Sequence, residues 1–335
     1  MNMKSAQERL LKALANALVV FGWLAAMPCS AATTLTLAHI YTPEHPSAKA
    51  SQRFAEMLKE NSRGRIQVKL YAEGALGNQT AIIQSLKNGS LDLSMLSQGS
   101  VSQIAPEFNV LGLPYLFPSH AAVWRLLNGS IGQQLVQKLA AKGVVVLDFW
   151  DVEVRHFSNS VHPIIKPADL AGLKIRNPPD VMAADIVSAL GCRPMEIMFS
   201  DLYKALQAGV VDGQDNTLIN FQTSRLYDVQ KFISLTGHRY SVYSFLMNKS
   251  SWDKLSAADR DIVMEAAHEA SRYQRELSRN AETEAYRDLV ARGVRINKVD
   301  VRPFVAATAP VYDKWYASPI GDFVRVVVQA ARERQ

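Results

Sequence analysis

The sequence has few cysteines: only Cys29 and Cys192 occur among its 335 residues. Two cysteines are too few for a disulfide-stabilised scaffold or for a multi-cysteine zinc or iron–sulfur site. No two of the 17 glycines stand two residues apart, and no glycine directly precedes a lysine. The dinucleotide-binding motif G-x-G-x-x-G and the P-loop are therefore both absent.

Charge of one sign is not concentrated anywhere in the chain. The 37 basic and 31 acidic residues give a net charge of +6, and they occur without a block of five like charges. Most lysines and arginines stand near acidic residues, as on ordinary solvated helices. We therefore expect no nucleic-acid partner.

The sequence motifs of common hydrolases are incomplete. A zinc-protease motif begins at His268, but Arg272 stands where its second histidine is required, and no G-x-S-x-G motif occurs. Cys192 closes an apolar segment, where a buried thiol is the usual occupant. Five intervening residues impose no metal-ligand geometry on either pair of histidines, His39 with His45 and His156 with His162. We expect no enzyme, no metal site and no cofactor, with a hydrolase or lyase as a remote alternative.

Long apolar runs are also missing, except near the N-terminus. Three basic residues precede the apolar run Ala13–Met27, and small residues follow it at Ala31 and Ala32. Fifteen residues at ~1.5 Å each cannot comfortably cross a hydrocarbon layer of ~30 Å. We therefore predict that residues 1–32 form a cleaved secretory signal peptide and that the mature chain is exported.

The length predicts two domains, because single cores stop growing at ~250–300 residues. With 48% hydrophobic and 20% charged residues, the chain is typical of globular proteins. Predicted strands and helices alternate, which indicates an α/β fold. We expect strands at Thr34–His39, Arg65–Tyr71, Leu91–Leu96, Val144–Trp150, Leu173–Arg176 and Val210–Val211, and helices at Ser47–Asn61 and Thr80–Lys87.

A short pattern recurs, in which leucine, glycine and aspartate follow one another at three-residue spacing. In both places it joins a helix to a short apolar strand: Leu86-x-x-Gly89-x-x-Asp92 and Leu206-x-x-Gly209-x-x-Asp212. The glycine suits a left-handed residue at the end of a helix. The pattern indicates either an internal repeat or a connection common to all α/β proteins.

A long helix is predicted near the C-terminal third. No glycine occurs between Gly237 and Gly293, and Ser256 can cap a helix that runs from Ala257 to Ala291. At the standard rise, this helix is ~50 Å long and can brace both domains. Two shorter helices that meet near Asn280 are the alternative.

Cationic side chains follow predicted strands. Arg176 ends the strand Leu173–Arg176, Arg155 follows the strand Val144–Trp150, and the amide of Asn216 follows Val210–Val211. Ligands of open α/β sheets bind outside the carboxyl ends of strands, and a guanidinium matches a carboxylate with two parallel hydrogen bonds. Each arginine, taken alone, could equally form a structural salt bridge.

These segments carry a resemblance to a known family. The run Asp169-Leu170-x-Gly172-Leu173-Lys174-Ile175-Arg176-x-Pro178 resembles the signature of the DctP-type solute-binding proteins of TRAP transporters. Further segments agree in order along the mature chain: Leu76-Gly77-Asn78, Gly89-Ser90-Leu91-Asp92, Leu113–Phe117, Arg155-x-x-x-Asn159-Ser160, Met198–Tyr203, Val211–Asn216 and Tyr227–Lys231.

The resemblance implies a type II periplasmic binding protein, with two α/β lobes around a ligand cleft and a long helix that braces both. We expect lobe I at residues 33–152 and 242–281, and lobe II at residues 153–241 and 282–335. The resemblance further implies a monomer that delivers a small organic acid to a TRAP membrane permease. By resemblance, Arg176 binds the ligand carboxylate, Arg155 supports it, Asn216 hydrogen-bonds it and Phe199 forms an apolar wall. Phe199 could alternatively pack in the core.

Lobe I must contact the rest of the ligand. Its candidates are neutral or acidic residues at strand ends, namely His39, Glu73, Gln79, Ser97 and Gln98, with Trp150 as an apolar face or a core residue. Gln79 and Ser97 replace acidic residues of the sialic-acid-binding branch, so sialic acid is not expected. Hydroxyl groups suit such residues, whereas a second carboxylate would need another cation. We favour a sugar acid, such as a uronate, aldonate or keto-sugar acid, over a C4-dicarboxylate. A ligand-sensing subunit that docks on a receptor is a further alternative.

Overall fold

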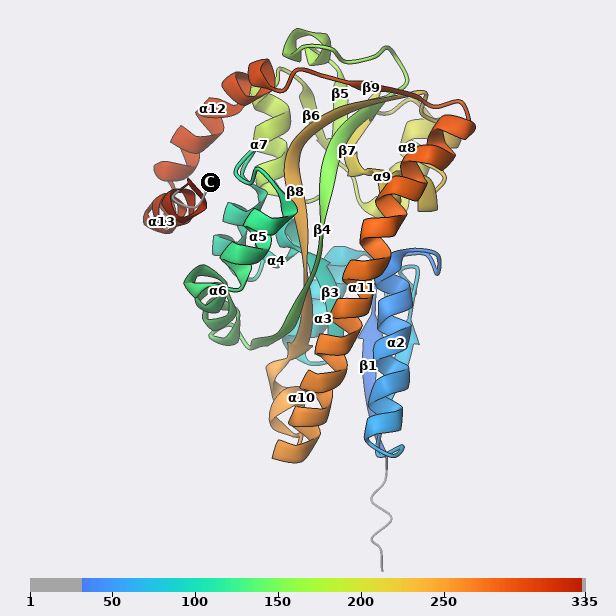
Figure 1. Ribbon diagram of the computed structural model, residues 1–335, viewed down its shortest axis with the longest axis vertical. Coiled ribbons are helices and arrows are strands. Elements are labelled where there is room, and N and C mark those ends of the chain that lie inside the picture. Colours follow the sequence, from blue (N-terminus) through green and yellow to red (C-terminus); the bar gives the residue numbers. More distant parts are fainter. Residues whose placement is uncertain (1–31, 333–335) are drawn as a thin grey trace, which may run out of the picture. The chain divides into compact units, whose positions relative to one another are not determined.

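The computed structural model describes residues 32–332, apart from the side chains of residues 151–153 (Figure 1). The compact unit that holds the fold begins at Thr34. The predicted signal peptide, residues 1–32, lies almost wholly outside the described residues. No helix within residues 32–332 is long and apolar enough to span a membrane.

Strands and helices alternate through most of the chain. The strands are β1 (Thr33–Ala38), β2 (Ile66–Tyr71), β3 (Leu93–Ser97), β4 (Val144–Asn159), β5 (Lys174–Asn177), β6 (Arg193–Glu196), β7 (Gly213–Thr217), β8 (Phe232–Asn248) and β9 (Arg295–Lys298). The α-helices are α2 (Pro46–Asn61), α3 (Gln79–Asn88), α4 (Gln98–Val101), α5 (His120–Leu127), α6 (Ser130–Ala140), α7 (Val181–Ala189), α8 (Phe199–Gln207), α9 (Leu218–Thr223), α10 (Lys249–Asp253), α11 (Ala257–Ala291), α12 (Arg302–Tyr316) and α13 (Gly321–Arg332). Three short 3-10 helices are η1 (Pro106–Gly112), η2 (Pro167–Leu170) and η3 (Leu226–Asp228).

The strands of the described residues form one sheet in the order β2-β1-β3-β8-β4-β7-β5-β6, and β9 pairs with β8. The long strands β4 and β8 are antiparallel and pair from Val144 opposite Asn248 to Asn159 opposite Phe232. β3 pairs with the end of β8, and β7 pairs with the end of β4. The two long strands therefore join an N-terminal sheet half (β1, β2 and β3) to a C-terminal sheet half (β5, β6 and β7), as Figure 1 shows.

The recurring Leu-Gly-Asp pattern occupies equivalent places in the two sheet halves. Gly89 and Gly209 both have a positive φ, at 79° and 67°, and each directly follows a helix or its last turn. The Oδ2 atom of Asp92 accepts a hydrogen bond of 2.7 Å from the backbone N–H of Thr36 in β1. Asp212 Oδ2 accepts an equivalent bond of 2.7 Å from the N–H of Lys174 at the start of β5. In each half, the aspartate thus fixes the start of one parallel strand to its neighbour.

The long helix is continuous and matches the predicted bounds, Ala257–Ala291. Ser256 Oγ accepts a hydrogen bond of 3.1 Å from the N–H of Asp259 and caps the helix, as predicted. The two ends of α11 join different hydrophobic clusters: Val263, Ala266 and Ala270 pack with Phe54 and Leu58 of α2, and Ala285 and Leu289 pack with Leu202 and Phe221. The helix therefore braces both sheet halves (Figure 1).

The C-terminal helices differ from the expected division into lobes. Residues 282–335 were assigned to lobe II, and α12 does contact α7. Helix α13, however, packs against η1 and α5, both within residues 33–152. Its apolar face, which includes Val324, Val327 and Val328, is buried in the largest hydrophobic cluster. Burial of this face places α13 on elements assigned to lobe I.

Two strand predictions near the site were wrong. The predicted strand Val210–Val211 is replaced by β7, so Asn216 lies within a strand and not after it. β4 does not end at Trp150 but continues to Asn159, so Arg155 also lies within a strand. Most residues of β7 and several of the later part of β4 are polar, and hydrogen bonds and ion pairs compensate the burial of most of them.

Candidate ligand-binding site

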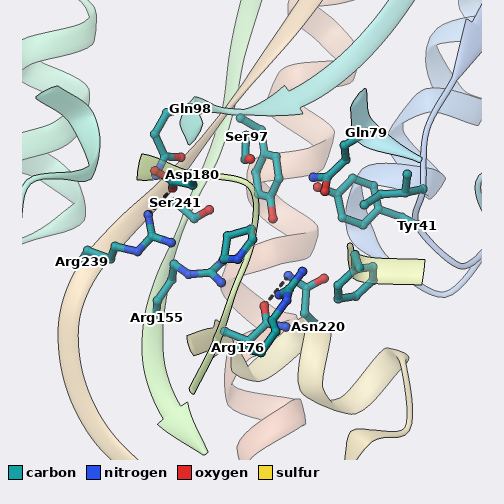
Figure 2. A pocket seen from close by; sticks show the side chains of 15 residues that line it. Tyr41, Gln79, Ser97, Gln98, Arg155, Arg176, Asp180, Asn220, Arg239 and Ser241 are labelled. Carbon is teal, nitrogen blue, oxygen red and sulfur yellow. Dashed lines mark hydrogen bonds and ion pairs between the residues drawn. The ribbon is translucent and has the colours of Figure 1, made fainter. Parts of the chain in front are cut away.

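A cavity lies where the carboxyl ends of β3, β5 and β7 approach the middle of β4 and β8. Open α/β sheets bind ligands at such a position. Figure 2 shows the side chains that line it. The polar ones are Tyr41, Gln79, Ser97, Gln98, Arg155, Arg176, Asp180, Asn216, Asn220, Arg239, Ser241 and Tyr243, and the apolar ones are Ile40, Pro178 and Phe199.

Arg176 is a buried cation that pairs with no acidic side chain among residues 32–332 as described. β5 carries it into the cavity wall, where only 1% of the residue is exposed. Its Nε atom donates a hydrogen bond of 2.8 Å to the carbonyl oxygen of Ile197, and its Nη2 atom has no partner. Burial lowers the pKa of Arg176 to about 9, and repulsion by Arg155 acts in the same direction. The group stays protonated at neutral pH and presents an unused donor to an anion.

Arg155, by contrast, is already paired. Its Nε atom donates to Asp215 Oδ1 over 2.7 Å, and its Nη2 atom donates to the carbonyl oxygen of the same residue. Burial alone would raise the pKa of Asp215, but the charges of Arg155 and Arg239 outweigh it and hold that pKa well below its ordinary value. Asp215 is therefore ionised. It compensates the positive charge of Arg155, which lies near Arg176 in the cavity.

Arg239 is a third buried arginine, which the sequence reasoning missed. Its Nη2 atom donates to Asp215 Oδ2 and its Nη1 atom donates to Asp180 Oδ2, each over 2.7 Å. Burial disfavours its charge, but Asp215 and Asp180 more than compensate and raise the pKa of Arg239 above its ordinary value. Arg239 is thus held in place by two carboxylates.

The charges around the cavity leave one positive charge. Three arginines, Arg155, Arg176 and Arg239, face two aspartates, Asp180 and Asp215. His238 contacts Asp215 as well, with its Nε2 atom 3.1 Å from Oδ1, but burial lowers the pKa of His238. Burial likewise lowers the pKa of His156, to about 3. Both imidazoles are therefore neutral at pH 7, and the excess charge suits a single carboxylate.

The rest of the cavity is neutral and polar. Gln79 begins α3, Ser97 ends β3 and Gln98 begins α4, and all three of these candidate residues line the cavity. Gln98 donates a hydrogen bond of 3.2 Å to the carbonyl oxygen of Tyr240, whereas its side-chain oxygen Oε1 is buried without a partner. In Figure 2, Gln79 and Tyr41 lie across the cavity from Arg239. Amides and hydroxyls of this kind bind ligand hydroxyl groups.

Asn216 and Phe199 also line the cavity. Asn216 donates a hydrogen bond of 3.0 Å to Gln214 Oε1, and its Oδ1 atom accepts one of 3.1 Å from Asn220 Nδ2. Phe199 opens α8, and the guanidinium carbon of Arg176 lies 5.9 Å from its ring centroid. Phe199 also packs against the hydrophobic cluster around Leu202. The residue therefore lines the cavity and also contacts the core.

Three predicted ligand contacts lie outside this cavity. His39 is buried, accepts a hydrogen bond from the N–H of Tyr41 and has a pKa lowered to about 4 by burial. Glu73 is exposed beside a neighbouring hollow that Gln79 and Phe199 also line. The Trp150 ring is fully buried, and its centroid lies 4.9 Å from that of Phe245. Of its two expected positions, Trp150 takes the core one, because neighbouring side chains cover its faces.

The missed residues Arg239, Ser241 and Tyr243 lie in the interior of β8. Ligand residues were expected at strand ends, because ligands of α/β sheets bind there. Alternate residues of a strand point to the same face of the sheet. The two-residue spacing of these three polar side chains was therefore the sequence pattern that could have identified them. Asp180, the N-cap of α7, was missed as well.

No group of three or more metal-ligating side chains occurs among the described residues. Cys192 is buried, and burial raises the pKa of its thiol to about 12. It therefore lacks the thiolate character of a nucleophile.

The profile of one protein family, described as bacterial extracellular solute-binding protein, family 7 (DctP), matches residues 37–318. This chain belongs to that family. An uncharacterized protein, y4mM, of Sinorhizobium fredii is 42% identical over 289 residues, which are 85% of this chain and 53% of that protein. The chain therefore spans about half the length of this relative.

Solved structures of related binding proteins share the fold. The sugar acid binding protein DctPAm of Advenella mimigardefordensis, in complex with galactonate, is 31% identical with a TM-score of 0.88, over 91% of this chain and 99% of that one. A TRAP periplasmic solute-binding protein of Sulfurospirillum deleyianum with bound succinate is 30% identical with a TM-score of 0.85, over 90% of this chain and 100% of that one. Both the predicted family and the predicted fold class are thus confirmed, and the family consists of binding proteins and not of enzymes.

Proposed function

We propose that this protein is the solute-binding component of a TRAP transporter and that it captures one sugar acid in the cavity around Arg176. The observation that carries the proposal is the buried guanidinium of Arg176, which has a donor atom without a partner. A buried, unpaired charge is costly, and a ligand carboxylate would pair it. Family membership supports the same role.

The ligand class follows from the charge balance. One excess positive charge accommodates one carboxylate, and the neutral groups of Gln79, Ser97 and Gln98 suit hydroxyl groups. A second carboxylate would lack a free cation among the described cavity residues, since Arg155 and Arg239 are paired. The relative with bound galactonate carries an acid of the expected kind. An aldonate, a uronate or a keto-sugar acid therefore fits better than a C4-dicarboxylate.

The binding mode assigns a task to each side chain. Arg176 holds the ligand carboxylate, and Arg155 keeps Asp215 in place. Asn216 and Phe199 border the carboxylate end of the ligand. We further propose that lobe I and lobe II close on the ligand, with α11 as the brace, and that Trp150 supports the site from the core. Since α13 packs on lobe I elements, the boundary of lobe II belongs before this helix.

Location and partners complete the proposal. Residues 1–32 have the composition of a secretory signal peptide, so we infer cleavage and a periplasmic, monomeric mature protein. Delivery of the acid to the membrane requires a TRAP permease as partner. Mass measurement of the exported protein tests the cleavage: a mature chain that starts near Thr33 is expected, and an intact N-terminus would contradict it.

A thermal-shift screen tests the ligand class. Aldonates and uronates should raise the melting temperature, and succinate and malate should not, because binding to the folded state alone stabilises it. Calorimetric titration then gives the affinity and should show one site per chain. Stabilisation by succinate or malate, with no effect from any sugar acid, would replace this proposal with dicarboxylate binding.

A further inference from the structure

Asp180 stands in the cavity wall, and its two carboxylate oxygens have different partners. Oδ1 accepts a hydrogen bond of 3.2 Å from the N–H of Ala183 and caps α7. Oδ2 accepts a hydrogen bond of 2.7 Å from Arg239 Nη1. Both side chains of this ion pair are buried, with 4% and 1% of their surface exposed. The carboxylate therefore lies inside the cavity wall in a fixed position and stays next to a cation.

The position of this ion pair matters for the ligand. Figure 2 shows Asp180 and Arg239 beside Ser241 and Gln98, at a distance from Arg176. Without Asp180, Arg155, Arg176 and Arg239 would face Asp215 alone, and the cavity would carry two excess positive charges. A cavity with two excess positive charges suits a dianion. Asp180 thus pairs with Arg239, the cation that a second ligand carboxylate would need.

We propose that Asp180 is a specificity-determining residue that excludes dicarboxylates by pairing Arg239 with a carboxylate of the protein itself. A second carboxylate of a ligand would meet the negative charge of Asp180 and find Arg239 already bound on two sides. Specificity of this kind rests on a repulsive element as well as on attraction. The inference deepens the proposed function and rests on it, because it concerns the same cavity.

The variant Asp180→Asn tests the inference. Asparagine caps a helix about as well as aspartate, so α7 keeps its N-cap while the charge is removed. Galactonate and galactarate serve as probes, because they share one carbon chain and differ by a second carboxylate in place of a terminal hydroxymethyl group. Gluconate and glucarate, titrated in parallel, cover the other common configuration. The readout is the ratio of the dissociation constants of diacid and monoacid, measured by calorimetry.

The wild type should prefer the monoacid by about a hundredfold, and Asp180→Asn should narrow this ratio by about tenfold or more. The matched control is Asp185→Asn on the same helix. Asp185 accepts hydrogen bonds from Lys314 Nζ (2.6 Å) and Trp315 Nε1 (2.9 Å), and it does not line the cavity. The control removes the same charge elsewhere and should leave the ratio unchanged.

The outcomes separate the two proposals. If the wild type prefers the monoacid and Asp180→Asn keeps the wild-type ratio, the inference about Asp180 is wrong and the proposed function stands. An equal change of the ratio in Asp185→Asn would also overturn it, since the effect would then come from net charge alone. If the wild type binds the diacids better than the monoacids, both proposals fail.

Discussion

Arg176 and Arg155 carry the same side chain in different charge environments. Arg155 donates two hydrogen bonds to Asp215, whereas Arg176 has only the carbonyl oxygen of Ile197. The sequence alone could not separate their roles, because Asp215 stands sixty positions away from Arg155. The pairing depends on the register of β4 and β7, which places Phe157 opposite Asp215. Only the family resemblance ranked Arg176 above Arg155.

Asp215 holds the buried cluster together, which gives a stability prediction. Asp215→Asn removes the charge between Arg155 and Arg239 and leaves both guanidinium groups undercompensated in the interior. We expect the free energy of unfolding at pH 7 to fall by roughly 3–5 kcal/mol. Urea unfolding measures this directly. A variant as stable as the wild type would show that the cluster does not depend on the charge of Asp215.

The pH dependence of the same variant has a defined sign. The pKa of Asp215 in the folded state lies well below the ordinary 3.8, so the unfolded chain takes up a proton first as the pH falls. The stabilisation by the ionised Asp215 is therefore complete above the ordinary pKa of 3.8. It is lost as the pH falls below 3.8 toward the folded-state pKa. Between about pH 2 and 4, the wild type should lose stability more steeply than Asp215→Asn. Parallel curves would contradict the depressed pKa.

At the scale of elements, alternation and caps were the reliable signals. The bounds of α11 were predicted because Ser256 caps it and no glycine or proline interrupts it. The extension of β4 and the place of β7 were missed because their buried residues are polar. A strand is normally predicted from apolar residues, and ion pairs that compensate buried polar ones cannot be read from spacing. Arg239 was missed because ligand residues were expected at strand ends, whereas it lies in the interior of β8.

The contact between α4 and the segment before α7 predicts the effect of a single methyl group. A Cβ atom on Gly99 would clash with Asp180 Oδ2, and Gln103 Nε2 donates a nearby hydrogen bond to the carbonyl oxygen of Pro179. Gly99→Ala must push these segments apart at a typical cost of ~1–3 kcal/mol. Sugar-acid affinity should therefore fall about tenfold, as measured by calorimetry. Gly129→Ala, at the N-cap of α6, is the control and should bind as the wild type does.

The continuity of α11 gives a second prediction at this scale. Asn280 is exposed within the helix, at the position where the alternative placed a break. Asn280→Pro should lower the free energy of unfolding by ~3 kcal/mol, because proline removes a hydrogen bond and clashes with the preceding turn. Asn280→Ala should raise it slightly. If urea unfolding showed no difference between the two variants, the helix would be broken at this residue in solution.

At the scale of the whole molecule, the sequence predicted the family and the α/β class, and seven of the fifteen residues that line the cavity were among its candidates for ligand contact. The equivalent hydrogen bonds of Asp92 and Asp212 give the recurring pattern a structural meaning that seven positions could not establish. The packing of α13 was not predicted, since an amphipathic helix identifies its own buried face but not its partner. The charge balance of the cavity could not be predicted from the sequence either. It depends on five charged residues that the fold assembles from β4, β5, β7, β8 and the N-cap of α7.

The central claim is that one ligand carboxylate pairs with the guanidinium of Arg176, whose Nη2 atom has no hydrogen-bond partner. Calorimetric titration of the wild type, Arg176→Ala and Arg176→Lys with the sugar acid found in the screen tests it most directly. Arg176→Ala should lose over about a hundredfold in affinity, equivalent to ~3–5 kcal/mol, because the carboxylate loses its partner in a buried site. Arg176→Lys should lose about tenfold or more, since an ammonium group cannot form two parallel hydrogen bonds. Binding of Arg176→Lys as tight as that of the wild type would contradict the account.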